Sequence, residues 1–243
     1  MGGSDEVAAS NQETGRGEAQ VDPTISVVMT AYKRPRQLRR TLESIYRQSE
    51  PCEVVVVEDG KDGETEGVCG KYPVKYLCRP DRPTHPTFYN PAVVTNMGIR
   101  AATGDVVILQ NAECEHDGDV IRLFRERVQP GMAVFATVDA QKPDGTFNRW
   151  YCHPQYNRRP LFFCGAMYRK HFFELDLFDE EFGDYGWEDL DFADRMAEAG
   201  FRFQWADDIK AHHQWHEPYV GEARSRDLYN KKRAARGQPP YGE

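Results

Sequence analysis

Short apolar runs alternate with amphipathic segments along the first half of the chain. Residues 25–30 (Ile-Ser-Val-Val-Met-Thr) form a β-branched run that is typical of a buried strand. Pro35 can open a helix at its first turn, where its missing N–H costs nothing, and apolar residues then recur at helical spacing. The same patterns predict strands at 53–57, 74–78 and 105–110, and helices at 92–102 and 120–128. This succession predicts βαβ units in a mostly parallel sheet.

The second half is less regular but contains one clear amphipathic helix. It is expected at 190–199, where Gly200 can end it in the left-handed conformation. Apolar stretches predict strands at 133–138, 161–168 and 201–205. The intervening segment 139–160 is rich in Pro, Gly, Asn and Arg, and we expect it to be a loop.

Together these elements predict a single α/β domain over residues 23–218. The polar, Gly- and Glu-rich residues 1–22 are expected to be a disordered tail, and residues 219–243 a peripheral polar tail. Right-handed crossovers would bring the carboxyl ends of the parallel strands to one edge of the sheet. Ligands of open α/β sheets bind at that edge, so the residues that follow each strand are the candidates for chemistry.

Charge and composition narrow the function classes. The 243 residues carry a net charge of -8, which argues against a general nucleic-acid-binding surface but leaves a local basic patch open. The six cysteines show no C-x-x-C spacing, which argues against a zinc knuckle and suits a reducing compartment. The chain shows no signal-peptide pattern and no apolar run near the roughly 20 residues that span a bilayer, so we expect a cytoplasmic protein.

Polar side chains follow the first two predicted strands. Thr30, Tyr32 and Arg34 come after the first strand, where an aromatic ring could stack on a base and a cation could meet a phosphate. Glu58 and Asp59 follow the second strand, and their carboxylates could accept hydrogen bonds from a base imide or from ribose hydroxyls. These two segments are therefore candidates for nucleotide binding.

A second set of polar residues has the composition of a metal site. Asn111 and Glu113 follow the strand at 105–110, and alternate residues project to the same side if the chain stays extended. Their side-chain oxygens could hold a hard divalent cation and, through it, a diphosphate. Three histidines within residues 212–216 could supply further ligands at the same edge of the sheet.

Two adjacent carboxylates, Glu188 and Asp189, stand at the start of the helix expected at 190–199. Acidic residues in a first helical turn are stabilised by the helix dipole whether or not they have a function. A carboxylate that faces the ligand edge could also act as a general base. Together, the clusters supply the residue types for two tasks. A metal ion could hold a diphosphate donor, and one carboxylate of the pair could deprotonate an acceptor hydroxyl.

The order of these segments resembles family 2 glycosyltransferases of the GT-A fold, over about residues 25–218. Residues 25–34 resemble the opening strand and nucleotide-contacting loop of the family. Residues 54–60 resemble its Val-Asp-Asp-Gly segment, with Glu58 in place of the first Asp. The Asn-x-Gly pattern of the family helix is matched at Asn96.

The acceptor-side segment resembles the family most strongly. Residues 178–182, followed by Gly-Trp-Glu-Asp at 186–189, are similar to the Gly-Trp-Gly-Gly-Glu-Asp region of galactosyltransferase-like and chondroitin-polymerase-like enzymes. His213 resembles the late metal-binding histidine of that group.

This resemblance implies an inverting transferase that moves a sugar from a nucleoside diphosphate sugar, with UDP expected, to an acceptor hydroxyl. Asp189 is implied as the general base and Glu188 as the residue that orients the acceptor or the base. Glu113 and His213, with His216 as a substitute, are implied as ligands of Mn²⁺ or Mg²⁺. The implied donor contacts are Thr30, Tyr32, Arg34, Glu58, Asp59, Asn96, Asn111, Gly165 and Trp187.

One position departs from the family pattern. Asn111 stands where the Asp-x-Asp motif has its first carboxylate, so one ligand charge is lost. An inactive sugar-nucleotide-binding module therefore stays open as an alternative. The basic residues at 79–86, 157–160 and 231–236 also leave open a transferase that acts on a modified nucleic-acid base. A nucleotidyltransferase would need a glycine-rich phosphate loop after the first strand, and residues 30–35 contain no glycine.

Overall fold

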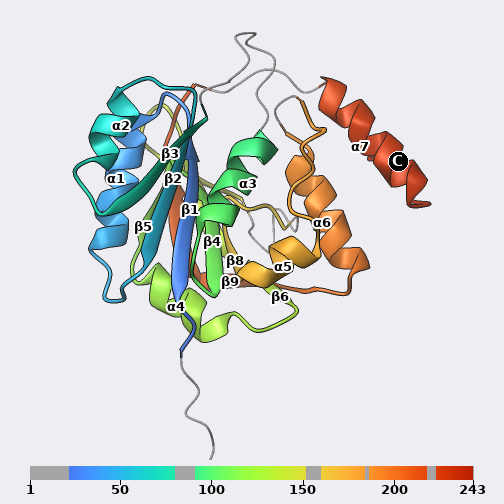
Figure 1. The fold of residues 1–243 in the computed structure, drawn as a ribbon, viewed down its shortest axis with the longest axis horizontal. Helices are drawn as coiled ribbons and strands as arrows, with labels where there is room; N and C mark the ends of the chain where they lie inside the picture. The colour runs from blue at the N-terminus through green and yellow to red at the C-terminus, as the bar shows by residue number, and fades with distance from the viewer. Residues whose placement is uncertain (1–21, 80–90, 152–159, 184–185, 218–222, 243) are drawn as a thin grey trace, which may run out of the picture.

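A mixed nine-stranded sheet forms the centre of the molecule (Figure 1). The computed structural model describes residues 22–79, 91–151, 160–183, 186–217 and 223–242. The strands are β1 (Ile25–Ala31), β2 (Glu53–Asp59), β3 (Val74–Arg79), β4 (Val106–Asn111), β5 (Cys114–Asp117), β6 (Met132–Gln141), β7 (Phe147–Tyr151), β8 (Cys164–Tyr168) and β9 (Arg202–His213). The helices are α1 (Pro35–Tyr46), α2 (Glu64–Cys69), α3 (Pro91–Ala101), α4 (Val120–Arg127), α5 (Arg169–Glu174), α6 (Glu188–Glu198) and α7 (Ala223–Ala235).

The strand order is β3-β2-β1-β4-β8-β6-β9-β5, with β7 paired to β6. Strands β3, β2, β1 and β4 are parallel, and the nearly continuous apolar runs of β1, β2 and β4 reflect burial on both faces. The sheet reverses direction at β8, which is antiparallel to both β4 and β6. The predicted α/β class is confirmed, and the parallel half places the ends of β1 and β4 side by side.

Helices cover both faces of the sheet (Figure 1). One core contains the buried faces of α1 and α4, and the other contains those of α3 and α6. Helix α3 lies close to the sheet because Gly98 has no side chain: a Cβ there would lie 2.5 Å from Cγ1 of Val28. Among the described residues, no helix combines the length and the apolar character needed to cross a bilayer.

Several elements were not anticipated from the apolar pattern. Strands β5 and β7 and helices α2, α5 and α7 are additions, and β9 continues to His213 instead of ending at 205. Strand β9 pairs with β6 on both sides of an irregularity at residues 207–209, and residues 210–213 also pair with β5, so ladder hydrogen bonds stabilise the polar end of the strand. Helix α7 lies within the segment expected as a peripheral tail, and its Tyr229 is only 2% exposed. The expected disordered tail lies almost wholly outside the described residues.

A buried polar cluster lies beneath the turn that joins β4 to β5. His116 is within 2.5 Å of the amide groups of both Gln110 and Gln48, and burial lowers its pKa to about 3. Between about pH 6.5 and 3 the unfolded chain binds a proton that the folded protein excludes. In this window the free energy of unfolding should therefore fall as the pH falls, by up to about 1.4 kcal/mol per pH unit from this residue.

Urea denaturation of the wild type and of His116→Gln at pH 7 and pH 5 measures this contribution. The difference in the free energy of unfolding between the two pH values should be smaller in the variant than in the wild type. Equal pH dependence in wild type and His116→Gln would show that His116 is not held neutral by burial.

Candidate active site

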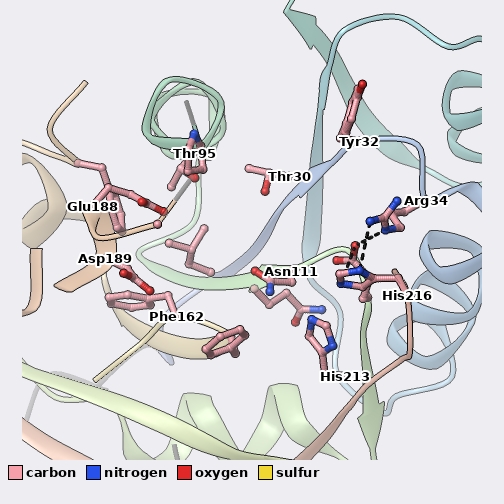
Figure 2. A pocket seen from close by; sticks show the side chains of 17 residues that line it. Thr30, Tyr32, Arg34, Thr95, Asn111, Phe162, Glu188, Asp189, His213 and His216 are labelled. Carbon is pink, nitrogen blue, oxygen red and sulfur yellow. Dashed lines mark hydrogen bonds and ion pairs between the residues drawn. The ribbon is translucent and has the colours of Figure 1, made fainter. Parts of the chain in front are cut away.

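A cavity of about 440 Å³ opens at the carboxyl ends of β1 and β4. Its wall includes Thr30, Tyr32, Arg34, Gln110, Asn111, Glu113, Glu188, Asp189, His213 and His216. Figure 2 shows the carboxylates of α6 at one end of this cavity and the histidines with Arg34 at the other, with Asn111 between them. Segments separated by more than 150 residues in sequence thus meet where an open α/β sheet binds its ligands.

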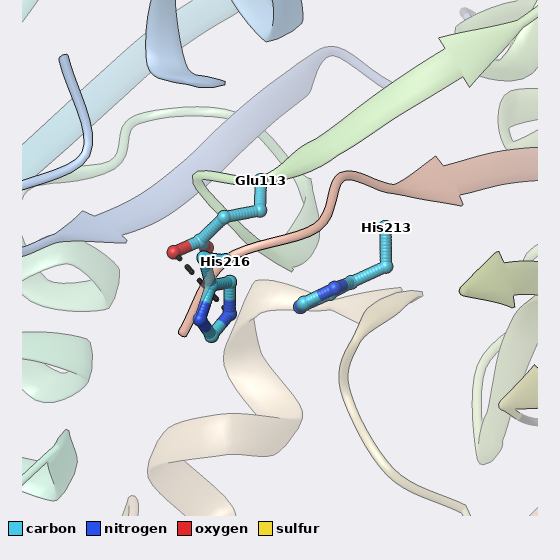
Figure 3. Close-up of side chains that lie close together, drawn as sticks. All are labelled: Glu113, His213 and His216. Atoms are coloured by element: carbon cyan, nitrogen blue, oxygen red, sulfur yellow. Dashed lines mark ion pairs between the residues drawn. The ribbon is translucent and has the colours of Figure 1, made fainter. Parts of the chain in front are cut away.

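One end of the cavity has a set of side chains suited to a metal ion (Figure 3). Glu113 lies in the turn after β4, His213 ends β9, and His216 follows it. One potential ligand atom from each of the three lies within 4.8 Å of the others. Ligands about 2.1 Å from a shared ion are at most about 4.2 Å apart, so small side-chain rotations would complete the site.

Hydrogen bonds fix the backbone that carries these three side chains. Gln214 donates its N–H to the carbonyl oxygen of Glu113 (3.0 Å), and its side-chain amide donates to Gln37 (3.1 Å) and Thr41 (3.2 Å). The Thr41 hydroxyl donates in turn to the carbonyl oxygen of Ala112 (2.8 Å). Helix α1 therefore ties the β4–β5 turn to the end of β9, so the histidines and Glu113 have a shared support.

The protonation of this cluster suits cation binding. Burial lowers the pKa of His213 to about 4, which leaves the imidazole neutral and its lone pair available at neutral pH. Burial raises the pKa of Glu113, while the nearby His216 and Arg34 act in the opposite direction. The guanidinium Nε of Arg34 lies 3.2 Å from Oε1 of Glu113 and balances its charge. The chemistry of these donors, a carboxylate and two imidazoles, fits a divalent cation.

The other end of the cavity carries Glu188 and Asp189, the first two residues of α6. Burial, and secondarily the charge of Asp189, raises the pKa of Glu188 well above its usual range. Its Oε2 is buried without a hydrogen-bond partner among the described residues. Asp189 accepts a hydrogen bond from the N–H of Leu190 at 2.8 Å. Two adjacent carboxyl groups therefore have different environments, an arrangement that can separate their roles in proton transfer.

Glu58 and Asp59, expected to contact the nucleotide, do not line this cavity. Strand β2 continues through both residues, so their carboxylates are fully buried within the strand instead of following it. Glu58 accepts hydrogen bonds from the hydroxyl of Tyr76 and from the N–H of Asp62 (2.9 Å). Asp59 forms an ion pair with Arg79 at 3.5 Å. Both carboxylates therefore have contacts within the protein.

Asn96 and Gly165, two other expected donor contacts, also lie outside the cavity wall. The Asn96 amide donates to the carbonyl oxygen of Phe178 (2.8 Å) and accepts from its N–H (3.0 Å), which joins α3 to the segment before α6. At Gly165 a Cβ would lie 2.7 Å from the ring of Phe135, so this glycine permits close packing. Asn96 and Gly165, which match the family pattern, thus contact other residues of the protein.

Trp187 is likewise absent from the cavity wall, and its ring packs against Tyr229 and Tyr241. Conversely, the sequence did not single out several residues that line the cavity. They are Pro91, Thr95, Leu109, Phe162 and Phe163. Most are apolar and resemble core residues, so no signal in one sequence separates them from the rest of the core.

Comparison with known proteins adds the family. The model of glycosyl transferase family 2 matches residues 26–180, which is more than half of the chain. The chain belongs to glycosyl transferase family 2. Family membership confirms the resemblance that the order of the motifs predicted. The matched residues include the β1–α1 segment and Glu113, whereas α6 and the histidines lie beyond them.

Solved glycosyltransferase structures share the fold of this chain. GalNAc-T7 with UDP, GalNAc and Mn²⁺ is 17% identical, with a TM-score of 0.65 over 86% of this chain and 48% of that one. A mannosyltransferase from Pyrobaculum calidifontis, in complex with GDP-Man and Mn²⁺, is 16% identical, with a TM-score of 0.56 over 88% and 61%. S. aureus TarS is 16% identical, with a TM-score of 0.60 over 79% and 37%.

At these identities the likeness shows the GT-A fold alone. The chain spans less than two thirds of the length of each of these three proteins. A comparison with curated protein sequences found no match.

Proposed function

We propose that this family 2 enzyme transfers a sugar, with inversion, from a nucleoside diphosphate sugar to an acceptor hydroxyl. The proposal rests on the arrangement of the cavity: side chains that could bind a metal ion lie at one end and two carboxyl groups lie at the other (Figure 2). Direct displacement needs this separation, because the base must lie on the side of the sugar opposite the departing diphosphate. The sequence resemblance supports UDP as the nucleotide, while the two ligand-bound neighbours carry UDP and GDP-mannose.

Glu113, His213 and His216 would hold a divalent cation, Mn²⁺ or Mg²⁺. The Mn²⁺ named for two structural neighbours supports this assignment. When bound, such a cation neutralises charge on the diphosphate that leaves. Arg34 adds a positive charge at the same end of the cavity. Asn111, whose side chain carries an amide oxygen, lies nearer the middle of the cavity (Figure 2).

Asp189 would act as the general base. The acceptor oxygen forms a bond to the anomeric carbon while the bond from that carbon to the diphosphate oxygen breaks, and Asp189 takes the proton that the acceptor loses. Glu188, whose pKa is raised by burial, would hold a proton and donate a hydrogen bond that orients the acceptor. The apolar wall at Phe162 and Phe178 would exclude water from the reacting carbon.

A thermal-shift screen of UDP-, GDP- and dTDP-sugars, with and without Mn²⁺, tests the donor half of this proposal. A donor at about 100 times its Kd should stabilise the fold by about 2.7 kcal/mol, and hence raise Tm by roughly 5–10 °C. The rise should need both the donor and the metal. If no nucleotide sugar shifts Tm under either condition, the cavity does not bind such a donor and the proposal fails.

A further inference from the structure

The turn that leads into α6 holds its backbone in an unusual conformation. Gly186 and Trp187 both have positive φ angles, of 89° and 78°, and Trp187 directly precedes Glu188. A residue other than glycine is strained in this region and persists there only where its surroundings fix it. The carbonyl oxygen of Trp187 accepts the N–H of Asp191 at 2.9 Å, so this residue also begins the first turn of α6.

The surroundings that fix Trp187 come from the segment at 223–242. Its ring centroid lies 5.4 Å from that of Tyr229 and 5.0 Å from that of Tyr241, and the Arg226 guanidinium lies 5.9 Å from the ring. The two tyrosine rings are 6.0 Å apart, so the three aromatic side chains form one cluster. We call Trp187, Tyr229 and Tyr241 the aromatic clamp.

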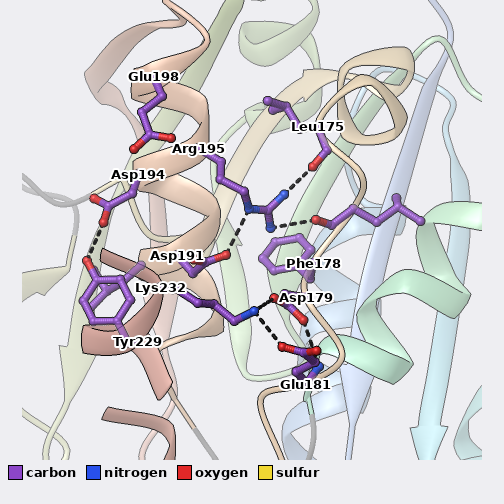
Figure 4. A network of polar contacts seen from close by, with 12 residues as sticks. Leu175, Phe178, Asp179, Glu181, Asp191, Asp194, Arg195, Glu198, Tyr229 and Lys232 are labelled. Carbon is purple, nitrogen blue, oxygen red and sulfur yellow. Dashed lines mark hydrogen bonds and ion pairs between the residues drawn. The ribbon is translucent and has the colours of Figure 1, made fainter. Parts of the chain in front are cut away.

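Helix α7 is attached to α6 mainly by charged groups (Figure 4). Arg233 and the hydroxyl of Tyr229 both donate to Asp194, at 2.7 and 2.8 Å. Arg236 donates to Asp191 at 2.8 Å, and Asp191 is only 1% exposed. Arg195 of α6 also donates to Asp191, at 2.9 Å, so cations from both helices balance the charge of this buried carboxylate. These contacts set the position of α7 relative to the helix that carries the carboxyl pair.

Helix α7 also contacts the segment at 178–182, which precedes α6. Lys232 lies 2.5 Å from Asp179 and 2.7 Å from Glu181 (Figure 4). Phe178, which precedes Asp179 in sequence, lines the cavity. Its carbonyl oxygen accepts a hydrogen bond from the side chain of Asn96 in α3. Helix α7 therefore joins two cavity-lining segments, although it supplies no residue to the cavity wall and lies beyond residues 26–180, which the family model matches.

We infer that residues 223–242 are a positioning element for the transfer site: through the aromatic clamp they hold the left-handed turn at Trp187 and so set where Glu188 and Asp189 point. This inference rests on the proposed function of the carboxyl pair. Tyr241 is the positioning residue that is most accessible to test, because its side chain is only partly buried, whereas Tyr229 is part of the core. Displacement of a base by about 1 Å can cost roughly 100-fold in rate.

Tyr241→Ala tests the inference, with Tyr241→Phe as the conservative variant and Phe173→Ala as the matched control. Phe173 is an exposed aromatic residue of α5 that does not line the cavity. For Tyr241→Ala we expect kcat to fall by roughly 10- to 100-fold with the donor KM unchanged. Tyr241→Phe keeps the ring and should restore kcat, and Phe173→Ala should match the wild type.

Hydrogen–deuterium exchange supplies a readout that does not depend on activity. Amides of residues 186–191 should exchange several-fold faster in Tyr241→Ala than in the wild type or Phe173→Ala. Unchanged exchange there would overturn the clamp, and faster exchange with an unchanged kcat would overturn its role in positioning. If the wild type transfers no sugar from any donor, the proposed function fails, while the exchange result still decides whether Tyr241 holds this turn.

Discussion

Replacement of Asp189 by Asn should lower the rate of sugar transfer by roughly 10²- to 10⁴-fold while donor affinity stays nearly the same. The amide matches the carboxylate in shape and can still accept from the N–H of Leu190, but it cannot take the proton of the acceptor hydroxyl. The donor nucleotide is expected at the opposite end of the cavity, beside Glu113 and the histidines. Product release measured in steady state, beside the donor Kd from calorimetry, separates these two effects.

Asp207→Asn is the matched control, since this exposed aspartate of β9 makes the same change of charge away from the cavity. It should behave as the wild type. Glu188→Gln identifies the base if the assignment is wrong. Wild-type turnover in Asp189→Asn, combined with loss of turnover in Glu188→Gln, would move the role of base to Glu188.

Replacement of His213 by Ala should weaken Mn²⁺ binding by at least roughly 10- to 100-fold and remove most metal-dependent transfer. Even partners that only orient a metal ligand contribute this much, so loss of a ligand should cost no less. His213 is 9% exposed and neutral at physiological pH, which makes its imidazole one of three candidate ligands. Calorimetric titration with Mn²⁺, with and without the nucleoside diphosphate, gives the affinity directly.

The neighbouring His212 provides an internal control. Its imidazole lies 3.6 Å from Asp117 and packs against Phe147, and it is absent from the cavity wall. His212→Ala should therefore keep the wild-type affinity for Mn²⁺. Equal losses in the two variants would mean that His213 has no specific part in holding the cation.

The sequence predicted the parallel half of the fold well, because strands buried on both faces read as continuous apolar runs. β1, β2 and β4 are of this kind, and the ends of β1 and β4 locate the site. The extension of β9 was not predictable in the same way. Its exposed residues, among them Asp207 and Asp208, interrupt the apolar pattern, and the end of the segment is a strand because it pairs with β5 and β6, which are distant in sequence.

The candidate site likewise contains residues whose place the sequence predicted and residues whose contacts it did not predict. Glu113, His213, His216 and the Glu188–Asp189 pair were expected at one edge of the sheet, and the structure places them around one cavity. Asn96 and Gly165 match the sequence pattern as well, yet their contacts are with the protein itself. A motif records which residue types are present, whereas the direction of each side chain depends on packing partners far away in sequence. Trp187 is such a case, because its tyrosine partners lie more than 40 residues further along the chain.

The most direct test of this account is the turnover of the donor that the thermal-shift screen selects, measured as release of nucleoside diphosphate during a screen of acceptors. With Mn²⁺ present, at least one acceptor should give a glycosylated product whose anomeric configuration, read by NMR, is opposite to that of the donor. Chelation of the metal should stop its formation. A donor that binds tightly but is never cleaved with any acceptor would contradict the account and would identify the protein as an inactive sugar-nucleotide-binding module.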